Sequence, residues 1–361
     1  MSTSETSAGW ADGAGGDQTY AGAGVDIEAG ERAVELMKHH VRRATRPEVV
    51  GGLGGFAGLF ALDVGRYAKP LLASSTDGVG TKLAIAQAMD RHDTVGIDLV
   101  AMVVDDLVVC GAEPLFLQDY IACDRVVPER IATIVGGIAE GCRQAGCALV
   151  GGETAEHGDQ MSPDAYDLAA TGVGVVDADA VLGAHLVRSG DVVLALGSSG
   201  LHSNGFALAR RVFAGRPLDA GAPDLVDGRT LGEELLTPTR IYALSCLELH
   251  RAAVVHAFAH ITGGGLAANL SRVLPPHLDA VIDRCAWTPA PIFGLIAGEG
   301  PVAPAEMERT FNMGVGMVAV VGAGAVQRAL DLLAASGVPA WITGEVVAGN
   351  GTARMVGEHP A

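Results

Sequence analysis

The amino-acid sequence predicts an α/β (α+β) protein of two domains. Its 361 residues exceed the roughly 250–300 at which a single hydrophobic core stops growing. Helix and strand patterns alternate through the first half, and the second half contains one unit twice, a strand that runs through a glycine-rich turn into a helix. We expect domains at residues 20–177 and 178–361, after a disordered leader at 1–19 that is rich in Gly, Ser and Ala.

The elements of the first half are framed by turn and cap residues. Residues 98–110 are apolar almost all round, which is typical of a buried helix. Pro128 and Gly146 mark the start and the end of another helix. The predicted order is helix 28–43, glycine loop 51–56, strand 70–75, helix 98–110, strand 115–122, helix 128–145, strand 148–150, strand 170–176 and a domain joint at 177–189.

The second half is predicted from its two glycine turns. Strand 192–196 leads into GSSGLHSNG and a helix from Phe206, and strand 254–261 leads into TGGG and a helix from Leu266. Each turn places glycines and hydroxyls at a helix N-terminus, where free N–H groups attract anions. Thr237 and Pro238 have the cap and first-turn residues of a further helix. Strand 314–321, helix 326–335 and strand 340–347 complete the prediction.

Composition excludes several classes of protein. A formal charge of −18 argues against nucleic acid or an anionic membrane as a partner. No apolar run reaches the roughly 18–20 residues of a membrane span, and the start of the chain lacks the pattern of a signal peptide. The six cysteines include no C-x-x-C pair, so we expect reduced thiols in a cytoplasmic protein, with metal or redox sites as the alternative.

An acidic segment at residues 92–124 is the first candidate functional feature. It contains no Lys or Arg, and ionised carboxylates within an apolar helix need a positive partner from elsewhere in the chain. Carboxylates at Asp105 and Asp106 suit Mg²⁺, a hard cation usually held by one or two carboxylates plus substrate phosphates. The alternative is pairing with distant arginines or solvation. The seven acids are Asp93, Asp98, Asp105, Asp106, Glu113, Asp119 and Asp124.

The stretch SSTDGVGTKL at residues 74–83 resembles a phosphate loop in the wrong order. A P-loop requires Gly-Lys-Ser/Thr at a helix start, whereas here the hydroxyl precedes the lysine and Asp77 lies inside the loop. A carboxylate there would repel phosphate unless a cation lay between them. We therefore expect Asp77 to bind Mg²⁺ and Lys82 to bind phosphate, and Glu153 could join the metal ligands.

The order of longer motifs resembles the phosphoribosylformylglycinamidine cyclo-ligase family, the aminoimidazole ribonucleotide synthetases. The resemblance runs from about Tyr20 to Glu345 and rests on SSTDGVGTKLAIA, GIAEGCRQAGCALVGGETAE, LGSSGLHSNGFALAR, HITGGGLAANLSRVLP and TFNMGVGMVAVV, among others. The stretch DLVVCGAEP from Asp106 resembles the D-x4-G-A-x-P signature of the wider superfamily, which binds ATP with Mg²⁺.

The resemblance implies a PurM-like fold, a reaction and a set of site residues. The two N-terminal domains of a homodimer would pair their sheets into a barrel, and a second α/β domain would complete each cleft. The enzyme would close formylglycinamidine ribonucleotide to 5-aminoimidazole ribonucleotide, with ATP phosphorylating the formyl oxygen and ADP and phosphate released. The expected metal ligands are Asp77, Asp106 and, second, Asp105.

The other implied roles fall into three groups. The expected ATP contacts are Gly52, Gly54, Gly55, Thr76, Gly78, Gly80, Thr81, Lys82, Gly111, Gly152, Glu153 and Thr154. The expected substrate contacts are Ser203, Asn204, Thr262, Gly263, Gly264 and Gly265. The expected catalytic residues are His202 and Lys82, where His202 either transfers a proton or caps the following helix.

Two departures and several alternatives stand beside this interpretation. In relatives the motif GGETAE is commonly followed by Met-Pro-Gly, whereas in this chain it is followed by HGDQM at residues 157–161. Asp105 stands where Asn is expected in many relatives. The alternatives are another ATP-dependent enzyme of the superfamily, such as thiamine-monophosphate kinase or selenophosphate synthetase, and a catalytically silent nucleotide-binding subunit. The silent subunit would bind ATP without substrate-dependent release of ADP.

Overall fold

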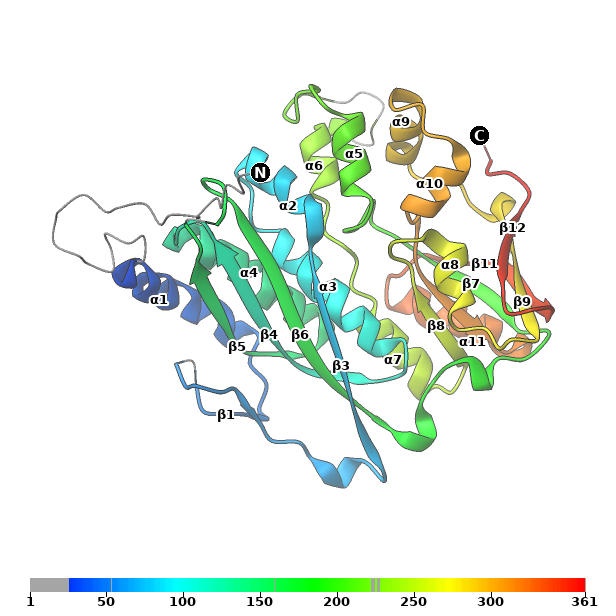
Figure 1. Cartoon of the computed structure of the whole chain (residues 1–361). Helices are drawn as coiled ribbons and strands as arrows, with labels where there is room; N and C mark the ends of the chain where they lie inside the picture. The colour runs from blue at the N-terminus through cyan, green and yellow to red at the C-terminus, as the bar shows by residue number, and fades with distance from the viewer. Residues whose placement is uncertain (1–25, 53, 159, 222–224, 226–227, 361) are drawn as a thin grey trace, which may run out of the picture.

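The computed structural model describes residues 26–52, 54–158, 160–221, 225 and 228–360, which form two mixed sheets with helices packed on them (Figure 1). The expected leader at 1–19 and Leu53 of the glycine loop lie outside these residues. The α/β class is confirmed. In the described ranges no helix combines the length and the apolar character needed to cross a bilayer.

The first sheet has four strands in the order β3-β6-β4-β5. β6 pairs antiparallel with both β3 and β4, while β4 and β5 are parallel and joined by a helix. A two-stranded ribbon, β1 with β2, precedes the sheet and was not predicted. The elements are α1 (Ile27–Arg43), β1 (Val49–Val50), β2 (Leu59–Phe60), β3 (Pro70–Gly78), α2 (Leu83–Met89), α3 (Val95–Val108), β4 (Glu113–Cys123), α4 (Pro128–Ala145), β5 (Ala148–Glu156) and β6 (Tyr166–Asp177).

Helices cover one face of this sheet and leave the other open. α3 and α4 lie against the sheet, and α1 packs on α4 (Figure 1). The inner face of β4 carries Leu115, Leu117 and Ile121, which are buried. On the opposite face Leu72 of β3 is 68% exposed and Tyr120 of β4 is 41% exposed. A sheet with one open apolar face is a potential contact surface.

The second sheet has six strands in the order β12-β9-β11-β7-β10-β8. Most neighbours are antiparallel, and β12 runs parallel to β9. Its elements, with the helices between them, are β7 (Val192–Gly197), α5 (Phe206–Val212), α6 (Leu231–Leu235), α7 (Ala243–Arg251), β8 (Val255–His260), α8 (Gly265–Ser271), β9 (Leu278–Asp283), α9 (Pro291–Glu299), α10 (Pro304–Thr310), β10 (Val315–Val321), α11 (Val326–Ala335), β11 (Ala340–Ala348) and β12 (Ala353–Val356).

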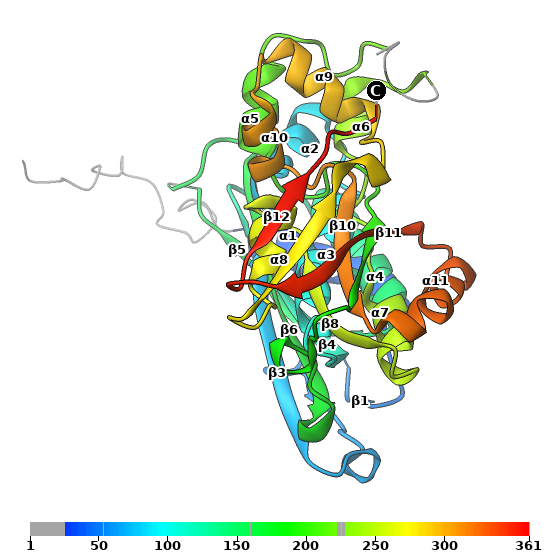
Figure 2. The same cartoon turned by 90° about the vertical axis from the view of Figure 1, so that its right-hand side faces the viewer.

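Helices cover both faces of the second sheet, with α7 and α11 on one side and α8 on the other (Figure 2). Successive residues of β7 therefore enter different cores, Leu194 with α7 and α11 and Val193 with α8. A strand buried on both faces reads as a continuous apolar run rather than an alternating one. This explains the sequence VVLAL in β7 and VGMVAVV in β10.

Helix α3 of the first domain and the 3₁₀ turn Gly80–Lys82 before α2 contact the second domain through a buried ion pair. The ammonium of Lys82 donates to Asp98 Oδ1 at 2.8 Å and to the carbonyl oxygens of His202 and Thr237 at 3.1 and 2.7 Å. Asp98 Oδ1 also accepts from the backbone N–H and the hydroxyl of Thr239 at 2.7 and 2.6 Å. Both members of the Lys82–Asp98 ion pair are fully buried. The expectation that the helix acids take a positive partner from elsewhere is confirmed here.

The helix expected to start at Pro238 is wrong. Residues 237–242 form no helix or strand, and α7 begins at Ala243. In this irregular segment, the carbonyl of Thr237 accepts from Lys82 and the N–H groups of Thr239 and Tyr242 donate to Asp98 and Asp105. Long-range hydrogen bonds to buried charges are stronger than the preference of a local N-cap for a helix.

We predict that Lys82→Met destabilises the protein by about 3–5 kcal/mol, because the change leaves Asp98 buried without its charge partner. Lys69→Met is the matched control, since Lys69 pairs with Asp179 on the surface, and it should cost less than about 1 kcal/mol. Urea unfolding followed by circular dichroism measures both. The double variant Lys82→Met/Asp98→Asn should recover part of the loss, and equal costs for Lys82→Met and Lys69→Met would contradict the interpretation.

Candidate active site in the interdomain cleft

Three polar side chains from three elements meet where the two domains face each other. Asp77 lies near the end of β3, Asp106 in the last turn of α3 and His260 at the end of β8. His260 Nδ1 donates to Asp106 Oδ1 at 2.8 Å. The side chain of Asp106 is 46% exposed, so its second oxygen remains open to a ligand. The structure thus brings together two of the three residues expected to bind metal.

The pKa values of Asp77 and His260 are shifted by burial and by neighbouring charges. Burial, together with the nearby charge of Asp106, raises the pKa of Asp77 above its ordinary value, although a hydrogen bond from Gly78 opposes the shift. Burial by itself lowers the pKa of His260, but its hydrogen bond to Asp106 and the charges of Asp105, Asp106 and Asp77 outweigh that effect and raise it. His260 is therefore favoured in its charged form, as the cation among three carboxyl groups.

Asp105 does not fit its expected role as a metal ligand. Its side chain is fully buried, and Oδ1 accepts from the backbone N–H of Tyr242 at 2.9 Å. Burial raises the pKa of Asp105 to about 7, with the charge of His260 opposing the shift. Asp105 is turned about 100° from Asp106 on α3, so the cleft receives only one of two adjacent acids. Asp105 holds the second domain, and Asp106 faces the cleft.

Lys82 does not fit a phosphate contact. The ammonium is fully buried, and its three donors are taken by Asp98, His202 and Thr237. Burial lowers the pKa of Lys82 while Asp98 opposes that shift. The lysine lies in the short 3₁₀ turn Gly80–Lys82, which directs it toward α3, away from the loop surface. Its role is to join the two domains, and it is withdrawn from the catalytic residues.

His202 and Ser203 also lie in the domain joint and do not fit their expected roles. His202 is buried, and its Nε2 accepts from the backbone N–H of Ser199 at 3.1 Å. Burial lowers the pKa of His202 well below its ordinary value, so the ring stays neutral and poorly suited to proton transfer. Ser203 Oγ donates to Thr239 Oγ1 at 3.1 Å, which places it behind Asp98. Gly205, not the His202 side chain, is the N-cap residue of the following helix.

The two glycine turns of the second domain, which follow equivalent strands in the repeated unit, lie against each other. Asn204 Oδ1 accepts from the backbone N–H of Gly263 at 3.1 Å. The amide of Asn269 donates to the carbonyl oxygens of Thr262, Gly263 and Gly265 and fixes the TGGG turn from inside. Gly263 is exposed, whereas Gly265 is buried, and Gly264 lies between them as the N-cap residue of α8. Of these glycines, Gly263 is therefore best placed to reach a ligand.

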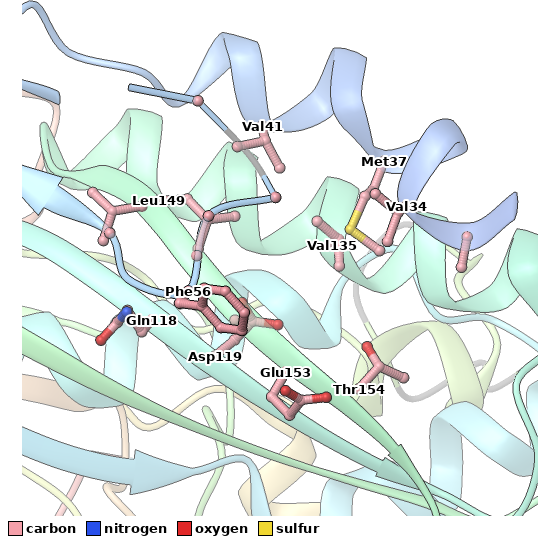
Figure 3. Close-up of a pocket in the computed structure, with 18 of the residues that line it drawn as sticks. Val34, Met37, Val41, Phe56, Gln118, Asp119, Val135, Leu149, Glu153 and Thr154 are labelled. Carbon is pink, nitrogen blue, oxygen red and sulfur yellow. The ribbon is translucent and has the colours of Figure 1, made fainter. Parts of the chain in front are cut away.

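A separate cavity of about 370 Å³ lies beneath α1 (Figure 3). It has apolar walls from α1, α4 and β5, and a polar end formed by Gln118, Asp119, Glu153 and Thr154. The glycine loop expected to contact ATP and residues 151–154 line this one cavity. Residues 151–154 lie within β5, which continues to Glu156, so the strand expected to end at residue 150 is longer than predicted. The glycines of the cavity include Gly52, Gly54, Gly55 and Gly152. Both segments are predicted to contact the nucleotide, and in the structure they lie side by side.

Asp119 is a half-buried carboxyl group to which the sequence assigns no specific function. It stands on the inner face of β4 between Leu117 and Ile121. Gly152 pairs with it in the parallel register, and a Cβ on Gly152 would lie 2.2 Å from its Oδ1, so this position requires glycine. Burial raises the pKa of Asp119 to about 7. The carboxyl lines the cavity beneath α1 and faces it without a positive partner in the described residues.

The remaining residues expected to contact ATP differ in how exposed they are to solvent. Thr81 and Gly80 are exposed at the end of β3 near Asp77, and Gly78 is half-buried beside them. Thr76 points to the open face of the sheet and shares a hydrogen bond of 2.8 Å with Thr171. Gly111 is buried, with φ at +84°, and a Cβ there would lie 3.0 Å from the ring of His250. Gly111 ends α3 and makes room for that ring, which does not fit a contact with nucleotide.

Sequence reasoning missed His260, although a signal was present. The residue is the last of an apolar strand and directly precedes Ile261 and the TGGG turn, where a strand end meets a predicted anion site. It also failed to assign Asp98, whose partner Lys82 is sixteen positions away in the chain. His157, to which no function was assigned, shares a hydrogen bond of 3.0 Å with Tyr120.

Family models and close relatives agree on this chain. The model described as the N-terminal domain of AIR synthase related proteins matches residues 62–176, and the corresponding C-terminal domain model matches residues 188–357. A phosphoribosylformylglycinamidine cyclo-ligase from Anaeromyxobacter dehalogenans is 55% identical over 92% of this chain and 96% of its own. One from Brevibacillus brevis is 51% identical over 92% of this chain and 96% of its own.

Solved structures with the same fold are more distant in sequence. Thiamine-monophosphate kinase from Stenotrophomonas maltophilia superposes with a TM-score of 0.65 at 19% identity, covering 90% of this chain and 97% of its own. The hydrogenase maturation protein HypE in complex with ATP superposes with a TM-score of 0.63 at 18% identity, covering 92% of each chain. At these identities the likeness concerns the fold.

We predict that Asp119→Asn stabilises the protein at pH 8 and has little effect at pH 4. An acid whose pKa rises to about 7 on folding keeps its proton in the folded state, so stability falls as pH rises from the unfolded value of roughly 4 through 7. Asparagine has no such penalty. The difference between the thermal midpoints of the variant and the parent should grow with pH, and a difference independent of pH would contradict the raised pKa.

Proposed function

The chain belongs to the phosphoribosylformylglycinamidine cyclo-ligase family, and from this premise we propose that its reaction takes place in the cleft around Asp77, Asp106 and His260. The enzyme is a ligase of purine biosynthesis that uses ATP to close the imidazole ring of aminoimidazole ribonucleotide. The observation that carries the site assignment is the meeting of these three side chains between the domains.

The chemistry requires the formyl oxygen of formylglycinamidine ribonucleotide to become a leaving group. That oxygen attacks the γ-phosphorus of ATP, the bond to ADP breaks, and an imidoyl phosphate forms. The amidine nitrogen then attacks the former formyl carbon, and the phosphate departs with the oxygen. Such steps are catalysed mainly by positioning and by neutralising developing negative charge.

The carboxylates of Asp77 and Asp106 fit a Mg²⁺ site that is completed by substrate. Each lies close enough to influence the other, and the described residues hold no group of three or more His, Cys, Asp or Glu side chains arranged to bind a metal by themselves. Mg²⁺ is usually held by one or two carboxylates plus substrate phosphates. When bound, the ion would supply positive charge to the phosphates of ATP. Glu153 lines the other cavity and has no contact with this pair in the described hydrogen bonds.

His260 replaces His202 as the histidine of the site. Its hydrogen bond directs Asp106 so that one carboxylate oxygen stays free, and its charge offsets the surrounding acids. It acts as a positioning residue for Asp106. The exposed Gly80 and Thr81 at the end of β3 remain candidates to contact the phosphates of ATP.

We assign the cavity beneath α1 to the nucleoside part of ATP. A purine has apolar faces and polar edges, which match the apolar walls of the cavity and its end at Gln118 and Asp119 (Figure 3). Asp119 and Asp77 pair with the same residue, Ala170, so they stand two strands or about 10 Å apart. The Asp119→Asn variant tests this assignment as well, because its KM for ATP should change and that for the ribonucleotide should not.

The open face of the first sheet favours a homodimer. Leu72, Ser74 and Thr76 alternate onto this face of β3, with Tyr120 on the same face of β4. A second copy that covers this face would bury these apolar groups and join the two sheets into the expected barrel. The absence of a membrane-spanning helix among the described residues and the pathway of the family support a cytoplasmic enzyme.

We predict that ADP release from ATP and Mg²⁺ depends on formylglycinamidine ribonucleotide, and that Asp106→Asn lowers kcat at least about 100-fold while the protein folds normally. The reason is the loss of a charge that would hold the metal beside the transferred phosphate. Asp93→Asn, an exposed acid of the same segment, is the matched control. ADP release without ribonucleotide dependence would overturn the function, and near-full activity of Asp106→Asn would remove that residue from the site.

We predict a dimer in solution that Leu72→Lys dissociates, because a buried unpaired ammonium opposes contact between two apolar faces. Ile342→Lys is the matched control: it places the same charge at a side chain that is 51% exposed on β11 in the second domain. Light scattering after size exclusion gives both masses. A monomeric parent protein at tens of micromolar, or a Leu72→Lys variant that stays dimeric, would contradict the proposal.

A further inference from the structure

A second polar wall faces Asp106 across the interdomain cleft. A cavity of about 330 Å³ lies between the domains, with Asp106 and His260 on its rim. Ser74 and Ser75 of β3 line one side, and Asn269 of α8 and Arg272, the C-cap residue of this helix, line the other. A volume near 300 Å³ is at the lower end for sites that bind small molecules. The wall from α8 carries the positive charge of this cavity.

Arg272 faces this cavity with most of its donors unused. In the part of the chain that the structure describes, it forms no ion pair, and its guanidinium donates one hydrogen bond, to Asn269 Oδ1 at 3.2 Å. The chain has 42 acidic and 24 basic residues, so carboxylate partners are plentiful. A guanidinium has five N–H donors in a planar fork that matches the oxygens of a phosphate group.

Asn269 fixes the position of this guanidinium. The asparagine is buried, and its amide nitrogen is held by the carbonyl oxygens of Thr262, Gly263 and Gly265. Its oxygen therefore points in a set direction and accepts from Arg272. An arginine held in this way loses less side-chain freedom when it binds an anion. The TGGG turn, which the sequence predicted at an anion, thus acts through Asn269 to orient the arginine.

We propose that Arg272 binds the 5′-phosphate of the ribonucleotide substrate, with Asn269 as its positioning residue and the hydroxyl of Ser75 on the opposite wall. The inference rests on the proposed function, because it names a subsite of the same cleft. The phosphate end of the substrate lies at the cation, and the reacting formyl group lies toward Asp106 and His260. This order keeps a dianion away from the two carboxylates.

Two phosphates could supply this chemistry, that of the ribonucleotide and the tail of ATP. The acids of the first domain, with Gly80 and Thr81, are the expected site of the triphosphate and its metal. Arg272 lies across the cleft from them, on the second domain. A single arginine with one hydroxyl suits one phosphate monoester. The ribonucleotide is therefore the favoured source.

Steady-state kinetics of Arg272→Gln tests the proposal. The KM for formylglycinamidine ribonucleotide should rise about 10–100-fold from loss of a charge-assisted contact, while the KM for ATP and the kcat at saturation change less than about twofold. Arg272→Lys should recover part of the affinity, since it keeps the charge and loses the fork. Ribose 5-phosphate should inhibit the parent enzyme in competition with the ribonucleotide, and inhibit Arg272→Gln less.

The matched control is Arg328→Gln, an exposed arginine of α11 on the far side of the second sheet, which should leave every constant unchanged (Figure 2). Thermal midpoints of both variants should match the parent, since Arg272 is exposed. An unchanged KM for the ribonucleotide in an active enzyme overturns the proposal. A rise in the KM for ATP alone also overturns it and assigns the arginine to the triphosphate. Failure of the proposed function is distinct, because the parent enzyme itself would then show no ribonucleotide-dependent ADP release.

Discussion

The buried ion pair between Lys82 and Asp98 is the interaction on which the arrangement of the two domains depends. Removing two charges from water is costly, and the cost is offset only when every donor and acceptor finds a partner. Lys82 meets this condition with Asp98 and two carbonyl oxygens. Asp98 meets it through Oδ1, which also accepts from the backbone N–H and the hydroxyl of Thr239, whereas its Oδ2 is buried without a hydrogen bond among the described residues. All of those further partners belong to the second domain. The pair is therefore satisfied only when the domains are docked, and docking forms the cleft.

The same helix carries both this joint and the candidate active site. Asp98 and Asp105 lie seven residues apart on one face of α3, and both accept from the irregular segment 237–242 before α7. Asp106 is turned away from them, toward the cleft and His260. Rigid attachment of one face fixes the direction of the other. A helix held at two buried acids is a firm base for Asp106, the third acid, which we propose as a ligand of Mg²⁺.

The few cations near the cleft are divided by task. Lys82 holds the domains, His260 balances and directs the acids, and Arg272 is left to meet an anion. A compact ammonium can satisfy three oxygens in a closed space, whereas a planar guanidinium fits an open wall that faces phosphate. Burial also separates the acids: Asp119 and Asp105 have raised pKa values because protein surrounds them, while Asp106 keeps access to solvent.

By itself the sequence determined the fold class, most long elements of both domains and the family, because periodicity, glycine turns and local motifs are short-range signals. It did not determine the strands β9 and β12 or the start of α7 at Ala243, and the roles predicted for Lys82, His202, Ser203 and Asp105 do not fit the burial of these side chains. Tertiary structure decided those roles. Whether a polar side chain faces solvent or is covered depends on partners such as Thr237 and Tyr242, which lie more than 130 positions away in the chain. Burial by those distant residues makes Lys82, which was expected to bind phosphate, a contact between the domains. It also covers His202, so His260 is the histidine at the candidate site.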